Sequence, residues 1–179
     1  MLLYYNLQLN NTFFLPVCQQ AVIILLTVRR GIMKYSVKLS HAVHILVFIY
    51  LSEGLPLSSD KIAESIHTNP GCVRQIMSVL RNAELIKSTT GHPKPELARE
   101  PETISLLDIY KAVEGDKPLL HLDTHTNPEC GIGVNIQLAL QSFYDKVQKD
   151  AENSMAGISL SDIIRGYYQR IEKSEQTGR

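Results

Sequence analysis

Two short helix signals separated by a two-residue turn constrain this chain more than any other feature. Ser58 or Ser59 can cap a first helix that runs through Ile66, because a serine side chain accepts a backbone N–H at that position. His67-Thr68 then makes a tight turn, although this turn often holds glycine. Asn69-Pro70 begins the second helix, since Asn is a preferred N-cap and Pro suits the first helical position. The pattern predicts a helix-turn-helix.

The second helix, expected over Asn69 to Ala83, has one apolar and one polar side. Its apolar residues recur at helical spacing and should face a core: Val73, Ile76, Met77 and Leu80. Its outward positions hold Arg74, Gln75, Ser78 and Arg81. Arginine can pair with a guanine edge, glutamine with adenine, and serine with a phosphate. We therefore expect this helix to read DNA, while an ordinary helical hairpin with a polar outer face is the alternative.

The flanking segments predict the rest of a winged helix. Residues 36–52 carry a wide apolar face and predict a helix that ends before Gly54 and Pro56. Residues 85–88 and 96–99 indicate two short strands on either side of a turn-rich loop, and such a hairpin forms the wing after a reading helix. Three more helices are expected, over residues 103–115, 132–151 and 159–171. The predicted fold class is mainly α with a small β wing (α+β).

The long helix over residues 132–151 has an apolar stripe. Its members are Ile136, Leu140, Phe143 and Val147. A long helix with such a stripe outside a small DNA-binding core is usually a dimer element. The sequence thus predicts a dimer interface here, with packing inside one monomer as the alternative.

Charge is informative only locally, because the formal net charge of the chain is zero. Residues 65–95 contain four basic side chains and one acidic one, whereas residues 96–129 contain eight acidic side chains and three basic ones. A polyanion is attracted to the first stretch and repelled by the second. The asymmetry has the correct sign for a compact DNA-facing module.

The first 32 residues are treated separately from the fold. Phe13–Val28 is apolar but interrupted, and it falls short of the roughly 20 residues that a membrane anchor needs. Residues 1–12 contain no Lys or Arg, so a secretory signal lacks its basic region. We expect Met33 to be the natural start and residues 1–32 to be a non-native or mis-annotated extension, with a weak anchor or a real extension as alternatives.

Cysteine usage and the missing catalytic motifs narrow the function. Cys18, Cys72 and Cys130 form no CxxC pair and no disulfide framework, which fits a reducing cytoplasm. The sequence has no Gly-rich phosphate loop, nucleophile elbow or HExxH motif, so we do not expect an enzyme.

Several spaced motifs resemble the Rrf-two family of bacterial winged-helix regulators. They are Met33–Ser36, Lys61–Glu64, Val79–Ile86, Leu97–Arg99, Ile104–Gly115 and Ile158–Asp162, of which Ile104–Gly115 is the most distinctive. The resemblance implies a cytoplasmic, homodimeric transcription factor, usually a repressor, that binds double-stranded DNA at a roughly palindromic operator. It also implies a winged helix-turn-helix domain over 33–115, an effector or sensor loop over 116–131, and dimerisation and C-terminal helices over 132–179.

The outward residues and these motifs together give the expected DNA contacts. They are Lys34, Tyr35, Ser36, Ser59, Thr68, Asn69, Pro70, Gly71, Arg74, Gln75, Ser78, Arg81, Thr89, His92 and Lys94. Two departures from the family affect them. The wing has lost the family's glycine-rich pattern and its preceding Arg, and Arg74 stands where IscR-like members have an acidic residue. Because Glu accepts from cytosine while Arg donates to guanine, the operator of those members cannot be carried over.

The expected sensor loop also departs from the family. Cluster-binding members place three Cys in this loop, and here only Cys130 is present. The stretch Asn127–Gln137 instead resembles the YwnA-like branch, which lacks the iron–sulfur cluster, so we expect no cofactor. His121, His125 and Cys130 could in principle hold a metal ion, but polar loop residues are the simpler interpretation.

Two further alternatives concern the signal and the function. Cys130 is a candidate single-thiol redox switch, with a buried, inert cysteine as the alternative. The effector could thus be an unknown small molecule or a redox signal. The altered wing also allows a dimeric partner-binding protein that kept the winged fold and lost specific DNA binding.

Overall fold

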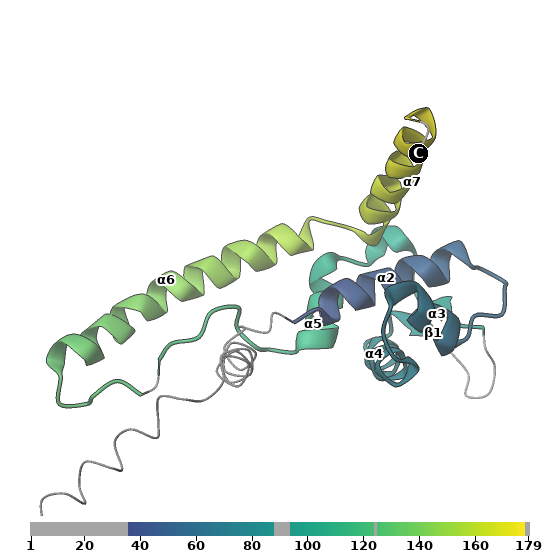
Figure 1. Ribbon diagram of the computed structural model, residues 1–179. Helices are drawn as coiled ribbons and strands as arrows, with labels where there is room; N and C mark the ends of the chain where they lie inside the picture. The colour runs from purple at the N-terminus through teal and green to yellow at the C-terminus, as the bar shows by residue number, and fades with distance from the viewer. Residues whose placement is uncertain (1–35, 88–93, 124, 178–179) are drawn as a thin grey trace, which may run out of the picture. The chain divides into compact units, whose positions relative to one another are not determined.

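The computed structural model describes residues 36–87, 94–123 and 125–177. These residues form six α-helices, one 3-10 helix and a two-stranded antiparallel sheet (Figure 1). In chain order they are α2 (Lys38–Leu51), α3 (Ser59–Ile66), α4 (Pro70–Asn82), β1 (Ile86–Lys87), β2 (Glu96–Leu97), η1 (Pro101–Thr103), α5 (Leu106–Glu114), α6 (Gly131–Ala156) and α7 (Leu160–Gln176). The expected α+β class is confirmed. The proposed extension over residues 1–32 lies outside the described residues.

One hydrophobic core joins α2, α3, α4, α5 and the start of α7. Its fully buried side chains include Ile45 and Leu46 of α2, Ile62 of α3, Leu80 of α4 and Leu160 of α7. The apolar residues of α4 that the sequence assigned to the core lie there, with Met77 packed against its edge. Burying these side chains removes apolar surface from water, which is the main force that fixes α4 against α2, α3 and α5.

The helix-turn-helix forms as its capping residues predict. The Ser58 hydroxyl accepts the Lys61 backbone N–H at 3.3 Å, and the Asn69 side chain accepts the Cys72 N–H at 2.8 Å. His67 closes α3 in the left-handed conformation, with φ 59° and ψ 49°. This conformation favours glycine and is sterically unfavourable for other residues. The packing of the two flanking helices therefore keeps His67 in a strained backbone conformation.

The second wing strand is shorter than the sequence predicts. Among the described residues, Ile86 pairs with Leu97 and Lys87 pairs with Glu96. One more backbone bond, from the Ala98 N–H to the Leu85 carbonyl at 3.0 Å, continues the contact at the base. The predicted length of the second strand is wrong, because the chain turns into η1 at Pro101 soon after β2. The predicted end of the first strand, residue 88, lies outside the described residues.

The helix expected over residues 103–115 begins later, at Leu106. Ser105 is its N-cap, and a capping box joins Ser105 and Asp108 in both directions at 3.0 Å. The preceding backbone is extended because it pairs with the segment before α7. The Leu106 N–H donates to the Ile158 carbonyl, and the Leu160 N–H donates to the Ile104 carbonyl, both at 2.8 Å.

The last two helices also run further than predicted. α6 continues to Ala156, beyond the expected end at residue 151, and stops at Gly157. α7 extends to Gln176 and begins with a second capping box, between Ser159 and Asp162. The hydrogen bonds from Ser159 lower the pKa of the Asp162 carboxyl, because they stabilise its charged form. Among the described residues, no helix is both long and apolar enough to cross a membrane.

Candidate nucleic-acid interface

The polar side of α4 carries the expected base-reading residues. Arg74, Gln75 and Arg81 are exposed, and Ser78 is half-buried. On the opposite side, Val73 and Leu80 are fully buried in the core. The helix is thus fixed by its apolar side and presents guanidinium and amide groups to solvent, as a reading helix requires.

The N-terminal turn of α4 leaves little room around its cap. Asn69 is exposed, Thr68 and Pro70 are half-buried, and Gly71 lies in the first turn. A Cβ atom added at Gly71 would lie 3.0 Å from Oδ1 of Asn69, closer than ordinary van der Waals contact. Glycine therefore keeps the capping amide in place and leaves this end of the helix open for close approach by a backbone phosphate.

A hydrogen bond between α3 and α4 was not evident from the sequence. Nη1 of Arg74 donates to Oγ of Ser59 at 3.1 Å, across fifteen positions of the chain. Both residues were expected to contact DNA, but their separation in sequence gives no sign that they meet. The structure brings them together at the start of α3.

A second polar contact joins α2 to α3. Nε2 of His44 lies 2.9 Å from Oγ of Ser65. Partial desolvation lowers the pKa of the His44 imidazole, and the nearby His41 lowers it further. The neutral ring is thus the favoured form, and it bonds to the helix that precedes the turn.

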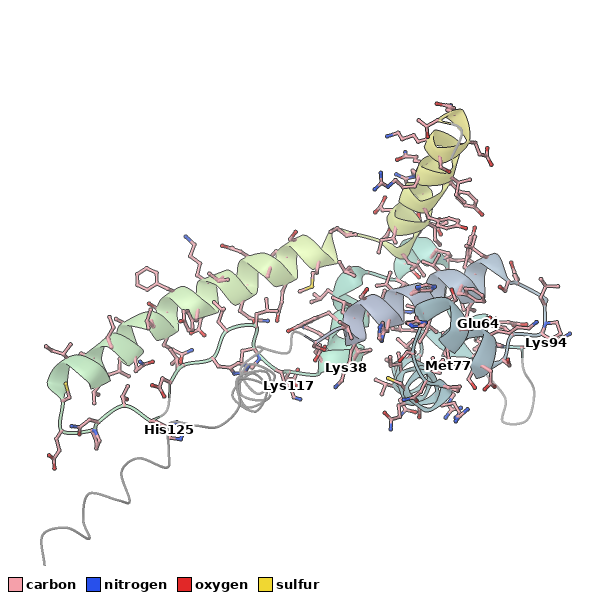
Figure 2. All side chains as sticks on the ribbon, viewed as in Figure 1. Lys38, Glu64, Met77, Lys94, Lys117 and His125 are labelled. Atoms are coloured by element: carbon pink, nitrogen blue, oxygen red, sulfur yellow. The ribbon has the colours of Figure 1, made fainter. Side chains whose placement is uncertain are left out.

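The remaining expected DNA contacts are placed only in part. Ser36 and Lys94 are exposed, and Lys94 lies just before β2 (Figure 2). Lys34, Tyr35, Thr89 and His92 lie outside the described residues. Of the three wing residues that were expected to contact DNA, Lys94 is the one that lies among the described residues.

The candidate metal ligands of the expected sensor loop lie apart in the described structure. Among the described residues, no group of three or more His, Cys, Asp or Glu side chains could hold a metal ion, so His121, His125 and Cys130 are not brought together as one. His125 instead lies 3.6 Å from the Asp123 carboxylate, and both are exposed (Figure 2). An iron–sulfur cluster requires several thiolate ligands, and this loop offers one. The donor set does not fit a cluster.

Cys130 is exposed rather than buried. Its sulfur accepts the Gly133 N–H at 3.4 Å, so it acts as the N-cap of α6. The expectation of a buried Cys130 is therefore wrong.

α6 presents an uncovered apolar surface. It has no buried residue, although it is 26 residues long (Figure 2). Ile136, Phe143 and Val147 of the predicted stripe are exposed, and Leu140 is half-buried. Ile132 and Leu138 are even more open, at 83% and 68%, and the sequence stripe did not include them. This surface needs a partner to be removed from water.

Comparisons with known proteins agree with this architecture. The sequence pattern of one family, described as "Rrf2: Iron-dependent Transcriptional regulator", matches residues 35–166. YwnA of Bacillus subtilis (strain 168), an HTH-type transcriptional regulator by name, is 39% identical over 127 residues, covering 71% of this chain and 94% of YwnA.

Solved structures give the same result. A crystal structure of a protein described as DNA-binding is 38% identical, with a TM-score of 0.59, and covers 71% of this chain and 98% of that one. IscR of T. potens is 28% identical, with a TM-score of 0.54, and covers 78% of this chain and 90% of its own. The fold is thus that of winged-helix regulators, and the chain belongs to the Rrf2 (Rrf-two) family of transcriptional regulators, with YwnA as a relative.

Proposed function

We propose that this protein is a homodimeric repressor that reads a roughly palindromic operator with α4. The observation that carries the proposal is α4 itself. It is capped by Asn69, its apolar side is held in the core, and it exposes Arg74, Gln75 and Arg81. In the major groove, these side chains can reach base edges, while Asn69 and Gly71 approach the phosphate backbone.

The dimer is supported by α6. Its exposed stripe at positions 136, 140, 143 and 147 repeats every four and three residues, the spacing of a helix–helix seam. A second copy presenting the same stripe would cover it, and two-fold symmetry would place two α4 helices on two half-sites. In this proposal residues 33–115 bind DNA, 116–131 receive the signal and 132–179 hold the dimer and the C-terminal helices.

The cellular location follows from DNA as the proposed binding partner. A repressor of this kind works in the cytoplasm, where its DNA lies, and its three cysteines suit a reducing compartment. The exposed thiol of Cys130 next to α6, or a small molecule bound near it, would supply the signal. No cofactor is needed for the DNA contacts described here.

Arg74→Ala is expected to weaken binding to the preferred operator by about 1–3 kcal/mol for each half-site, because one bidentate base contact is lost in each. The operator is obtained by selecting duplexes from a random library with the wild-type protein. Affinity is then measured by fluorescence anisotropy over a range of salt concentrations. Wild-type affinity should fall steeply with salt, because phosphate contacts release counterions.

The control for this variant is Arg170→Ala, which removes an exposed arginine from α7 rather than from α4. It should bind the operator as the wild type does. If the wild-type protein shows no salt-sensitive binding to any selected duplex, the DNA-binding proposal is wrong. A partner-binding winged-helix protein would then be the better account.

A further inference from the structure

The contact between Ser59 and Arg74 links the two helices of the helix-turn-helix at the DNA-facing side. Ser59 is the first residue of α3 and is half-buried, whereas Arg74 is exposed in the second turn of α4. Nη1 of Arg74 donates to the Ser59 hydroxyl oxygen at 3.1 Å. Within the described residues, Arg74 has no carboxylate partner. The serine is therefore the group that orients this guanidinium.

The geometry of the Arg74 guanidinium determines which of its N–H donors remain available to a ligand. Nη1 lies on the same side as Cδ, so Nε and Nη2 form the opposite edge of the planar group. With Nη1 bonded to Ser59, that edge keeps two parallel donors, which is the arrangement that O6 and N7 of guanine accept. Holding a long side chain in one rotamer before binding also reduces the entropy lost on binding.

The Ser59 hydroxyl can also make a further hydrogen bond. It accepts one hydrogen bond from Arg74, and its own O–H can still donate. A phosphate oxygen of the DNA backbone is the natural acceptor beside the start of α3. The Ser59 hydroxyl could thus donate to a phosphate and, at the same time, orient the arginine that reads the base.

We propose that Ser59 is a positioning residue that sets Arg74 for side-on recognition of a guanine in each half-site. The inference rests on the proposed function and deepens it. It assigns to Ser59 a role in sequence discrimination, where a plain phosphate contact would carry none. Because Ser59 orients Arg74 within the same chain, we expect the two residues to determine the base preference as one unit.

The test is a double-mutant cycle read out as base discrimination. Wild type, Ser59→Ala, Arg74→Ala and the double variant are titrated against the selected duplex and against duplexes in which single G·C pairs are replaced by A·T. The guanine read by Arg74 is the position where Arg74→Ala loses the preference. At that position Ser59→Ala should lower the G·C preference roughly three- to tenfold, the effect of one lost orienting hydrogen bond.

Two further readouts separate positioning from a general structural effect. Ser59→Ala should leave the salt dependence unchanged, because a neutral hydroxyl displaces no counterion. Ser59→Thr keeps the hydroxyl and should keep the G·C preference. Ser65→Ala, which removes a hydroxyl from the same helix that faces His44 instead, should also keep it. Circular dichroism confirms that each variant is folded.

The outcomes are distinct. In the Arg74→Ala background, Ser59→Ala should have no further effect on the preference at this position. The positioning role would be overturned if Ser59→Ala left the G·C preference unchanged. It would also be overturned if Ser59→Ala lowered that preference equally in the wild-type and the Arg74→Ala backgrounds. Neither result would contradict DNA binding itself. Absence of salt-sensitive binding by the wild type would overturn the proposed function, and this inference with it.

Discussion

Leu80→Ala is expected to lower the free energy of unfolding by about 2–5 kcal/mol, the cost of removing a leucine from a closed core. Leu80 lies on α4, is fully buried, and belongs to the cluster shared with α2 and α5. Since the free energy of unfolding of a small domain is only about 5–15 kcal/mol, the variant would lose a large share of its stability. The proposed DNA binding should weaken as well, because this packing is the main force that positions α4.

The measurement is urea denaturation followed by circular dichroism, at a fixed protein concentration because the proposed dimer would contribute to stability. Val79→Ala is the matched control, since Val79 is the neighbouring residue on the same helix and is 37% exposed. It should cost less than about 1 kcal/mol. Similar losses in both variants would show that the apolar side of α4 is not held as described.

Phe143→Glu is expected to convert the proposed dimer into monomers without unfolding the chain. Phe143 is 64% exposed on α6, so a charge there is hydrated in the single chain. In a two-fold interface it would bury two carboxylates, one from each copy, at a cost of several kcal/mol. The dimer dissociation constant should rise about 100-fold or more, since each 1.4 kcal/mol is a factor of ten.

Analytical ultracentrifugation over a range of concentrations measures this change, and operator binding gives a second readout. A monomer holds only one half-site, so affinity for the whole operator should fall about 100-fold as the tethered second contact is lost. Ser142→Glu adds the same charge one residue away, at an exposed position outside the stripe, and should remain dimeric. A wild-type protein that sediments as a monomer would contradict the role given to α6.

Local signals in the sequence predicted the helix-turn-helix well. Ser58 and Asn69 act as caps through short-range hydrogen bonds, so their positions mark the helix starts directly. The apolar spacing of α4 likewise gave the correct buried side, because a helix can turn only one side to the core. His67 was recognised as an unusual turn residue, and it adopts the left-handed conformation.

Non-local contacts account for the errors. Ile104 and Ser105 were assigned to a helix, but they pair with the chain around Ser159, more than fifty positions later. The apolar stripe of α6 ends near Val147, yet the helix continues to Ala156, and Lys111 of α5 lies 4.0 Å from the Glu152 carboxylate. Lys111 and Glu152 are 41 positions apart, so the local pattern of α6 does not reveal this contact.

The candidate site was predicted as a set of residues, but not as a set of contacts. Arg74 and Ser59 were both expected to face DNA, and the hydrogen bond between them was not foreseen. Such a bond depends on how α3 crosses α4, which is fixed by the shared core and not by sequence spacing. His121, His125 and Cys130 are likewise not brought together among the described residues, because loop spacing does not determine whether side chains converge.

Protection of guanine N7 from methylation by dimethyl sulfate tests the central claim most directly, because N7 lies in the major groove. With α4 in that groove, the wild-type complex on the selected duplex should protect guanines in two clusters. Their centres should lie about one helical turn apart, roughly 10 base pairs, or a multiple of it. Arg74→Ala should restore methylation of one guanine in each cluster. Salt-sensitive binding that leaves every guanine N7 reactive would contradict the account.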